Sequence, residues 1–155
     1  MQTKLLISSL ALAMASLFTL TATVQTTVKD AWVRGTVAQQ KATGMFAQLS
    51  SAQGSRLVAV STPVAGIAEI HEMAMEGNVM RMRALPDGLA LPAGKTVALQ
   101  PGGDHVMLMD LEESAEGRRQ VDLTLVFEGA DKKRETLQIK VPVRNLTAGP
   151  MMHKH

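Results

Sequence analysis

The chain has 155 residues, of which 16 are Lys or Arg and 14 are Asp or Glu, so its formal net charge is +2. A hydrophobic content of 46% is typical of a globular domain and excludes a disordered or collagen-like chain. The small net charge argues against nucleic acid as a partner. The absence of cysteine excludes disulfides, thiolate zinc sites, iron–sulfur clusters, c-type haem and blue copper.

Residues 1–22 are predicted to be a secretory signal peptide. Lys4 precedes an uncharged apolar run from Leu5 to Leu20, and small residues follow around Ala22. The run is shorter than the roughly 20 residues that a membrane-spanning helix needs. We therefore expect cleavage near Ala22, a periplasmic location and no membrane span in the mature chain. A lipid anchor is not expected, because it would need a cysteine.

Residues 23–144 are predicted to form one domain of short strands, followed by a flexible Met/His-rich tail over residues 145–155. The clearest strand patterns alternate apolar and polar residues or are rich in β-branched ones. They are Val58–Val60, Val97–Leu99, Val121–Phe127 and Leu137–Val141. Turn sequences with Gly, Pro and Asn interrupt at short intervals. About eight such strands predict an all-β fold, an antiparallel Greek-key β-sandwich.

Methionine and histidine gather in one window of this domain. Six of the eleven methionines lie between residues 71 and 109, namely Met73, Met75, Met80, Met82, Met107 and Met109. Residues that are two positions apart on a strand lie on the same face. His71 therefore faces the same way as Met73, and His105 faces the same way as Met107. The sequence Glu76–Asn78 predicts a hairpin turn between two of these strands. Imidazole and thioether groups of separate strands could then converge.

The chemistry of these groups indicates one metal above others. Thioether sulfur is a soft, neutral ligand that selects Cu(I), whereas zinc prefers thiolate, imidazole and carboxylate, and calcium prefers oxygen. The alternative is that the methionines fill gaps in the core, where this flexible side chain is common. We expect core packing for Met45, Met75 and Met109. At this point both interpretations of the remaining methionines stay open.

Four segments in and just before this window match the sequence pattern of a known family. They are Val64–Met73, Gly77–Arg83, Leu89–Gly94 and Pro101–Leu108. Together with Asp30–Arg34 and Val141–Val143 they resemble the PCu(A)C family of periplasmic copper chaperones, over about residues 26–143. The resemblance implies a cupredoxin-like or Ig-like sandwich that carries copper.

The resemblance also implies the copper ligands. The family pattern is His, ten residues, Met, twenty-one residues and His-x-Met; here 10 residues separate His71 from Met82, and 22 separate Met82 from His105. The resemblance therefore implies that His71, Met82, His105 and Met107 bind Cu(I). The neighbouring carboxylates Glu72 and Asp104 could orient the imidazoles. We expect them to be solvated charges instead, because adjacent residues of a strand point to opposite faces.

A second copper position is expected from other soft groups. Met73 and Met80 are candidates because they share strand faces with the implied ligands. Some family members carry a Met/His-rich C-terminal extension, and the tail residues resemble a short version that would take up Cu(II) as well as Cu(I). These residues are Met151, Met152, His153 and His155. The alternative for the tail is a chain end without function.

The function implied by the resemblance is Cu(I) carriage in the periplasm and delivery to a copper-accepting protein. The acceptor would be a cytochrome c oxidase subunit during assembly of its CuA centre, or another copper chaperone. This predicts a binding protein rather than an enzyme. The first alternative is a periplasmic copper-sequestering or resistance protein without a dedicated oxidase target. The second is an adhesion-type sandwich with a Met-rich core and no metal, and a copper redox enzyme is disfavoured by the missing cysteine.

Overall fold

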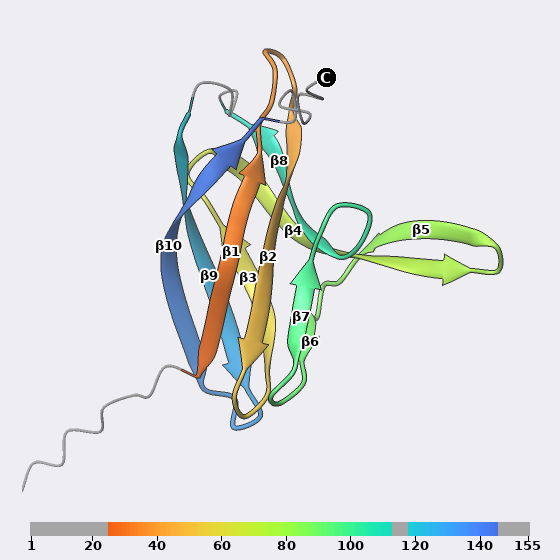
Figure 1. Cartoon of the computed structure of the whole chain (residues 1–155), viewed down its shortest axis with the longest axis vertical. Helices are drawn as coiled ribbons and strands as arrows, with labels where there is room; N and C mark the ends of the chain where they lie inside the picture. The colour runs from red at the N-terminus through yellow and green to blue at the C-terminus, as the bar shows by residue number, and fades with distance from the viewer. Residues whose placement is uncertain (1–24, 113–117, 146–155) are drawn as a thin grey trace, which may run out of the picture.

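The computed structural model describes residues 25–112 and 118–145, which form ten β-strands and no helix (Figure 1). The strands are β1 (Thr26–Arg34), β2 (Ala42–Ser51), β3 (Ser55–Ser61), β4 (Ala65–Glu76), β5 (Val79–Ala84), β6 (Leu89–Leu91), β7 (Thr96–Leu99), β8 (His105–Leu111), β9 (Gln120–Gly129) and β10 (Arg134–Arg144). The all-β class expected from the sequence is confirmed. In these described ranges no helix is long and apolar enough to span a bilayer.

The strands follow one another in the order β5-β4-β8-β2-β1-β10-β9-β3-β6, with β7 paired to β2. The strands from β5 to β1 form one layer and those from β10 to β6 form the other (Figure 1). The layers meet where β1 pairs with β10 in parallel, with Val33 opposite Val143. Every other pair between described strands is antiparallel. Parallel strands need a long connection, and here nearly the whole domain separates the two.

The core lies between the two layers. In β9 every second residue is buried, with Leu123 and Leu125 at 1% and 0% exposure. In β8, Val106 and Leu108 are fully buried and point to the same core. Met45 is also fully buried, as expected from the sequence. The core expectation for Met109 is wrong, because it is half-buried on the face of β8 that points away from Val106 and Leu108. Because the core side of β8 is apolar, its alternate residues, which include the predicted ligands, point away from the core.

The hairpin of β4 and β5 extends beyond the sandwich (Figure 1). Pairing of β4 with β8 ends at His71, and beyond that residue β4 pairs with β5 alone. We call residues 72–84 the hairpin arm. Gly77, with φ of 63°, lies at its turn, which confirms the predicted turn. The core expectation for Met75 is wrong: its side chain is 61% exposed, because no second layer covers the arm.

Candidate metal centre

The four implied ligands lie on one face of three neighbouring strands. The β4–β8 register places His71 directly opposite His105, so Met107 is a diagonal neighbour of His71. The β4–β5 register places His71 opposite Ala84, which makes Met82 a diagonal neighbour on the other side. Side chains in opposed positions have Cβ atoms about 4.5–5.5 Å apart, and diagonal neighbours are about 7–8 Å apart. His71 is therefore the centre of the set, within reach of the other three.

The two imidazoles are buried and in contact with each other. His71 is 7% exposed and His105 is 9% exposed. Their ring centroids are 5.5 Å apart, and the rings meet edge to face at an interplanar angle of 67°. Burial holds each ring in one orientation, so a metal ion at this point would meet preformed nitrogen ligands rather than mobile ones.

Hydrogen bonds determine which nitrogen of His105 is free. Its Nδ1 lies 2.9 Å from the carbonyl oxygen of Gly103. A carbonyl can only accept, so Nδ1 carries the proton and Nε2 of the neutral ring keeps its lone pair. His105 therefore offers Nε2 to a metal.

His71 uses the opposite arrangement. Its Nε2 lies 2.8 Å from Oε2 of Glu69, and because a carboxylate can only accept, Nε2 carries the proton and donates this hydrogen bond. Its Nδ1 is buried and has no hydrogen-bond partner among the described residues. A buried polar atom without a partner is costly. A metal ion bound to Nδ1 would satisfy it, so the residues present fit a metal at this position.

The two methionines differ in exposure. Met107 is half-buried on β8, whereas Met82 on the arm is 49% exposed. Two imidazole nitrogens and two thioether sulfurs are neutral and mostly soft, which suits Cu(I). Within the described residues, no group of three or more His, Cys, Asp or Glu side chains is arranged to hold a metal. A metal ion held by these four side chains would therefore have thioether sulfur as well as imidazole nitrogen as ligands.

Glu69, which the sequence pattern did not single out, is the hydrogen-bond partner of His71. It lies two positions before His71 on the same strand, and this spacing was the signal that could have found it. Within the described residues, the two carboxylates next to the histidines in sequence have partners other than an imidazole. Glu72 forms an ion pair with Arg83, and Asp104 accepts a hydrogen bond from a backbone N–H of β4.

Comparison with known proteins gives the family. A model described as "Putative lipoprotein LpqE-like" matches residues 26–143. The chain belongs to the LpqE-like family. It is 29% identical over 129 residues to "Putative lipoprotein Lxx21020" of Leifsonia xyli subsp. xyli (strain CTCB07), covering 82% of this chain and 74% of that relative.

Solved structures with the same fold are PCuAC domains and related proteins. The apo PCuAC domain from PmoF1 has a TM-score of 0.62 and 25% identity, covering 78% of this chain and 94% of that one. The solution structure of CuI-DR1885 from Deinococcus radiodurans has a TM-score of 0.61 and 29% identity, covering 81% of both chains. Apo-DR1885 has a TM-score of 0.59 and 26% identity, covering 96% of this chain and 98% of that one. A PCuAC-like fold is thereby confirmed for this LpqE-like chain.

A small cavity of about 250 Å³ lies beside the histidine pair, lined in part by Arg34, Phe46, His105 and Met107. The Phe46 ring centroid is 6.4 Å from that of His105, and the Arg34 guanidinium lies 5.4 Å from the Phe46 ring centroid. Gly44 makes this possible: a Cβ there would lie 2.7 Å from Cζ of Phe46. Phe46 therefore forms the apolar wall next to His105.

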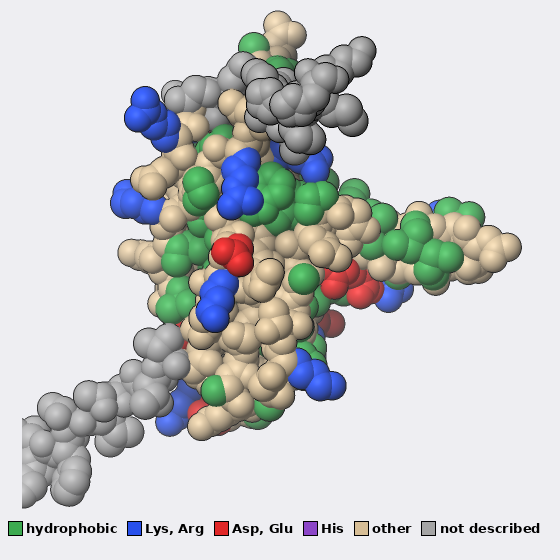
Figure 2. All heavy atoms as spheres, viewed as in Figure 1, with side chains coloured by type: hydrophobic (Ala, Val, Ile, Leu, Met, Phe, Trp, Pro, Cys, Tyr) green, Lys and Arg blue, Asp and Glu red, His purple; other side chains and the backbone are tan. Residues whose placement is uncertain are grey.

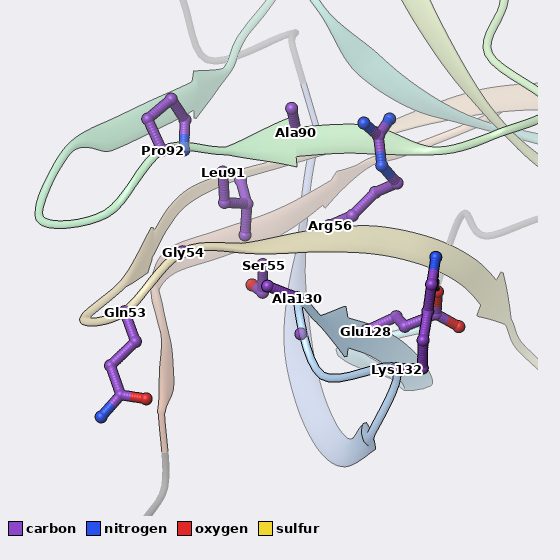
Figure 3. Close-up of a pocket in the computed structure, with 11 residues that line it drawn as sticks. Gln53, Gly54, Ser55, Arg56, Ala90, Leu91, Pro92, Glu128, Ala130 and Lys132 are labelled. Atoms are coloured by element: carbon purple, nitrogen blue, oxygen red, sulfur yellow. Dashed lines mark ion pairs between the residues drawn. The ribbon is translucent and has the colours of Figure 1, made fainter.

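Another pocket, of about 330 Å³, lies between β3, β6 and β9 (Figure 3). Its charged side chains already form an ion pair or hydrogen bonds with neighbouring residues. Lys132 pairs with Glu128, and Arg56 donates to the carbonyl oxygens of Asp87 and Gly88. No histidine or methionine lines it, so it offers no soft ligand.

The remaining sequence predictions have separate outcomes. Met73 lies directly opposite Met82, and Met80 lies opposite Met75, so the candidates on the arm are brought together in pairs. The tail residues Met151, Met152, His153 and His155 lie outside the described residues, as does the predicted signal peptide.

Proposed function

We propose that this LpqE-like chain binds Cu(I) through His71, Met82, His105 and Met107 and transfers it to a partner protein. The observation that carries the proposal is the buried His71–His105 pair, in which Nδ1 of His71 has no hydrogen-bond partner among the described residues. Two thioethers flank the pair diagonally. The Cu(I)-bound state named for the Deinococcus radiodurans relative supports the same cargo.

The ligand set is suited to release as well as to binding. All four ligands are neutral, so the bound ion keeps its positive charge, and a partner with thiolate ligands would bind it more tightly. Met82 is exposed, whereas both imidazoles are buried. The exposed thioether would exchange first when a partner approaches, and the imidazoles would hold the ion until the last exchange.

The proposed setting is the periplasm, and the word lipoprotein in the family description supports export. The proposed acceptor is a copper protein such as a cytochrome c oxidase subunit during CuA assembly, or another copper chaperone. A carrier of this kind is a binding protein and needs no catalytic group. Loss of oxidase activity in a deletion strain, rescued by added copper, would support delivery. Copper sensitivity with normal oxidase activity would instead support sequestration.

The direct test is an anaerobic Cu(I) titration of the full chain, with X-ray absorption at sub-stoichiometric copper. We expect two nitrogen and two sulfur neighbours, from the two histidines and two methionines. The variant H71A/H105A should lose the nitrogen neighbours and the tightest binding step. Met109→Leu is the matched control, because Met109 lies on β8 outside the set and should bind as the parent does. A copper environment without nitrogen in the parent would contradict the proposal.

A further inference from the structure

The hairpin arm carries four methionines in two opposed pairs. The β4–β5 register places Met73 opposite Met82 and Met75 opposite Met80. Opposed residues of an antiparallel pair lie on the same face, and so do residues two apart on one strand. All four thioethers therefore project from one face of the arm. Figure 2 shows hydrophobic side chains along the visible side of this projection. We call Met73, Met75, Met80 and Met82 the methionine ladder.

The charged residues of the arm lie on its other face. Arg81 forms an ion pair with Glu76 at 2.9 Å, and Arg83 forms one with Glu72. The charged residues alternate in sequence with the methionines, so their side chains point to the opposite face of the arm. The arm thus separates a paired, charged face from a face made of thioethers.

Burial does not explain the ladder. Met75 is 61% exposed, Met80 and Met82 are each 49% exposed, and Met73 is half-buried, since beyond His71 the arm is a two-stranded ribbon. Large apolar side chains usually lie inside a protein, so an exposed apolar group of this kind needs another explanation. The property that these four residues share, apart from being apolar, is sulfur.

The geometry of the ladder allows shared coordination. Opposed Cβ atoms lie about 4.5–5.5 Å apart, and methionine has three rotatable bonds beyond Cα, so two sulfurs across the ribbon can approach one ion. Thioethers are neutral and soft, and so take Cu(I) rather than zinc or calcium. Met82 belongs to both groups, because it is also the diagonal neighbour of His71.

We propose that Met73, Met75 and Met80 form a second site for a soft monovalent cation, Cu(I) or its analogue Ag(I), with Met82 common to this site and the histidine site. An ion bound on the exposed arm reaches the buried imidazoles through Met82 without release into solvent. Binding at the ladder stands on its own; only the route to the imidazoles rests on the proposed function.

The test is an Ag(I) titration of the full chain labelled with ¹³C at the methionine methyl groups, followed by NMR. In H71A/H105A the methyl signals of Met73, Met75 and Met80 should still shift, while that of Met107 should not. In M75L/M80L the Met107 signal should still shift and the Met73 signal should not. Met109→Leu is the control for loss of a methionine outside both sites, and it should leave all these shifts as in the parent.

The two proposals fail in different ways. If Ag(I) leaves the Met73, Met75 and Met80 signals unshifted in H71A/H105A, the second site is overturned and the ladder is only an apolar surface. If the Met107 signal shifts in no protein while the ladder signals do, the histidine site fails and the ladder stands. Because each signal belongs to one residue, any binding to the tail does not affect either conclusion.

Discussion

At the scale of single residues, the important asymmetry lies between the two imidazoles. Glu69 holds Nε2 of His71, while the Gly103 carbonyl holds Nδ1 of His105. Each ring is therefore fixed by one nitrogen and free at the other. Partners of this kind orient metal-binding histidines and fix their tautomer. The side chain that positions His71 is thus as much part of the site as the ligands.

Removing Glu69 should weaken copper binding without removing a ligand. In Glu69→Ala the His71 ring loses its acceptor, and we expect Cu(I) affinity to fall about 10–100-fold. Competition with a chromophoric Cu(I) chelator measures this. Glu72→Ala is the matched control, since Glu72 pairs with Arg83 on the other face of the arm. Equal affinities of the two variants would show that Glu69 does not position the ring.

Protons should compete with copper at the histidine site but not at the methionine ladder. A protonated imidazole has no lone pair for a metal, so affinity should be lower at about pH 5 than at about pH 7.5. Thioethers do not bind protons in this range, so the Ag(I) shifts of Met75 and Met80 should be the same at both pH values. Copper affinity that is independent of pH would argue against His71 and His105 as ligands.

Sequence spacing predicted much of this site and missed a definite part of it. The two-residue period of a strand correctly placed Met107 on the same face as His105. The same rule applied to Glu69 would have found the partner of His71. The direct pairing of His71 with His105 could not be predicted, because register between strands far apart in sequence depends on the packing of the whole sheet.

At the scale of elements, the hairpin arm depends on its turn. The turn was predictable, because Gly77 precedes Asn78 between two apolar strands, and Gly at the first central position with positive φ is typical of a type II′ turn. The arm's independence was not predictable, since nothing local shows that β4 leaves β8 beyond His71. The same holds for the parallel β1–β10 pair, whose partners lie at opposite ends of the domain.

Gly77→Ala should loosen the arm and leave the sandwich intact. Nothing lies within 4 Å of a Cβ at this position, so the cost is backbone strain alone, about 1–3 kcal/mol for a non-glycine residue held in a sparsely populated region at positive φ. Amide hydrogen exchange should accelerate in β5. Gly94→Ala is the control: like Gly77, Gly94 has a positive φ and no atom within 4 Å of an added Cβ, but it lies outside the hairpin arm. Unchanged exchange in β5 of Gly77→Ala would show that the turn does not limit the arm.

At the scale of the whole molecule, a two-layered sandwich carries a projecting two-stranded hairpin. The histidines lie where the two parts join, at the last residue of β4 that still pairs with β8. The burial of the histidines therefore depends on the sandwich, whereas the position of Met82 depends on the hairpin arm. The all-β class was predictable from alternating patterns, but this division of the site between the sandwich and the hairpin arm was not.

Damage to the core should lower global stability far more than damage to the surface. Leu125 is fully buried between the layers, so Leu125→Ala should reduce the free energy of unfolding by about 2–5 kcal/mol. Ile67, on β4, is 49% exposed, and Ile67→Ala should change the free energy of unfolding by no more than about 0.5 kcal/mol. Urea unfolding followed by Trp32 fluorescence measures both. Similar losses in the two variants would contradict the assigned core.

The exposure of the arm also makes it chemically vulnerable. Because Met75 and Met80 are exposed and Met45 is fully buried, peroxide should oxidise the two exposed thioethers first. Oxidation turns each soft sulfur into a polar sulfoxide, a change that methionine sulfoxide reductases reverse. An oxidised arm would no longer attract a soft ion, although the imidazoles would survive. Uptake of metal by this chain would then fall under oxidative stress and return after enzymatic repair.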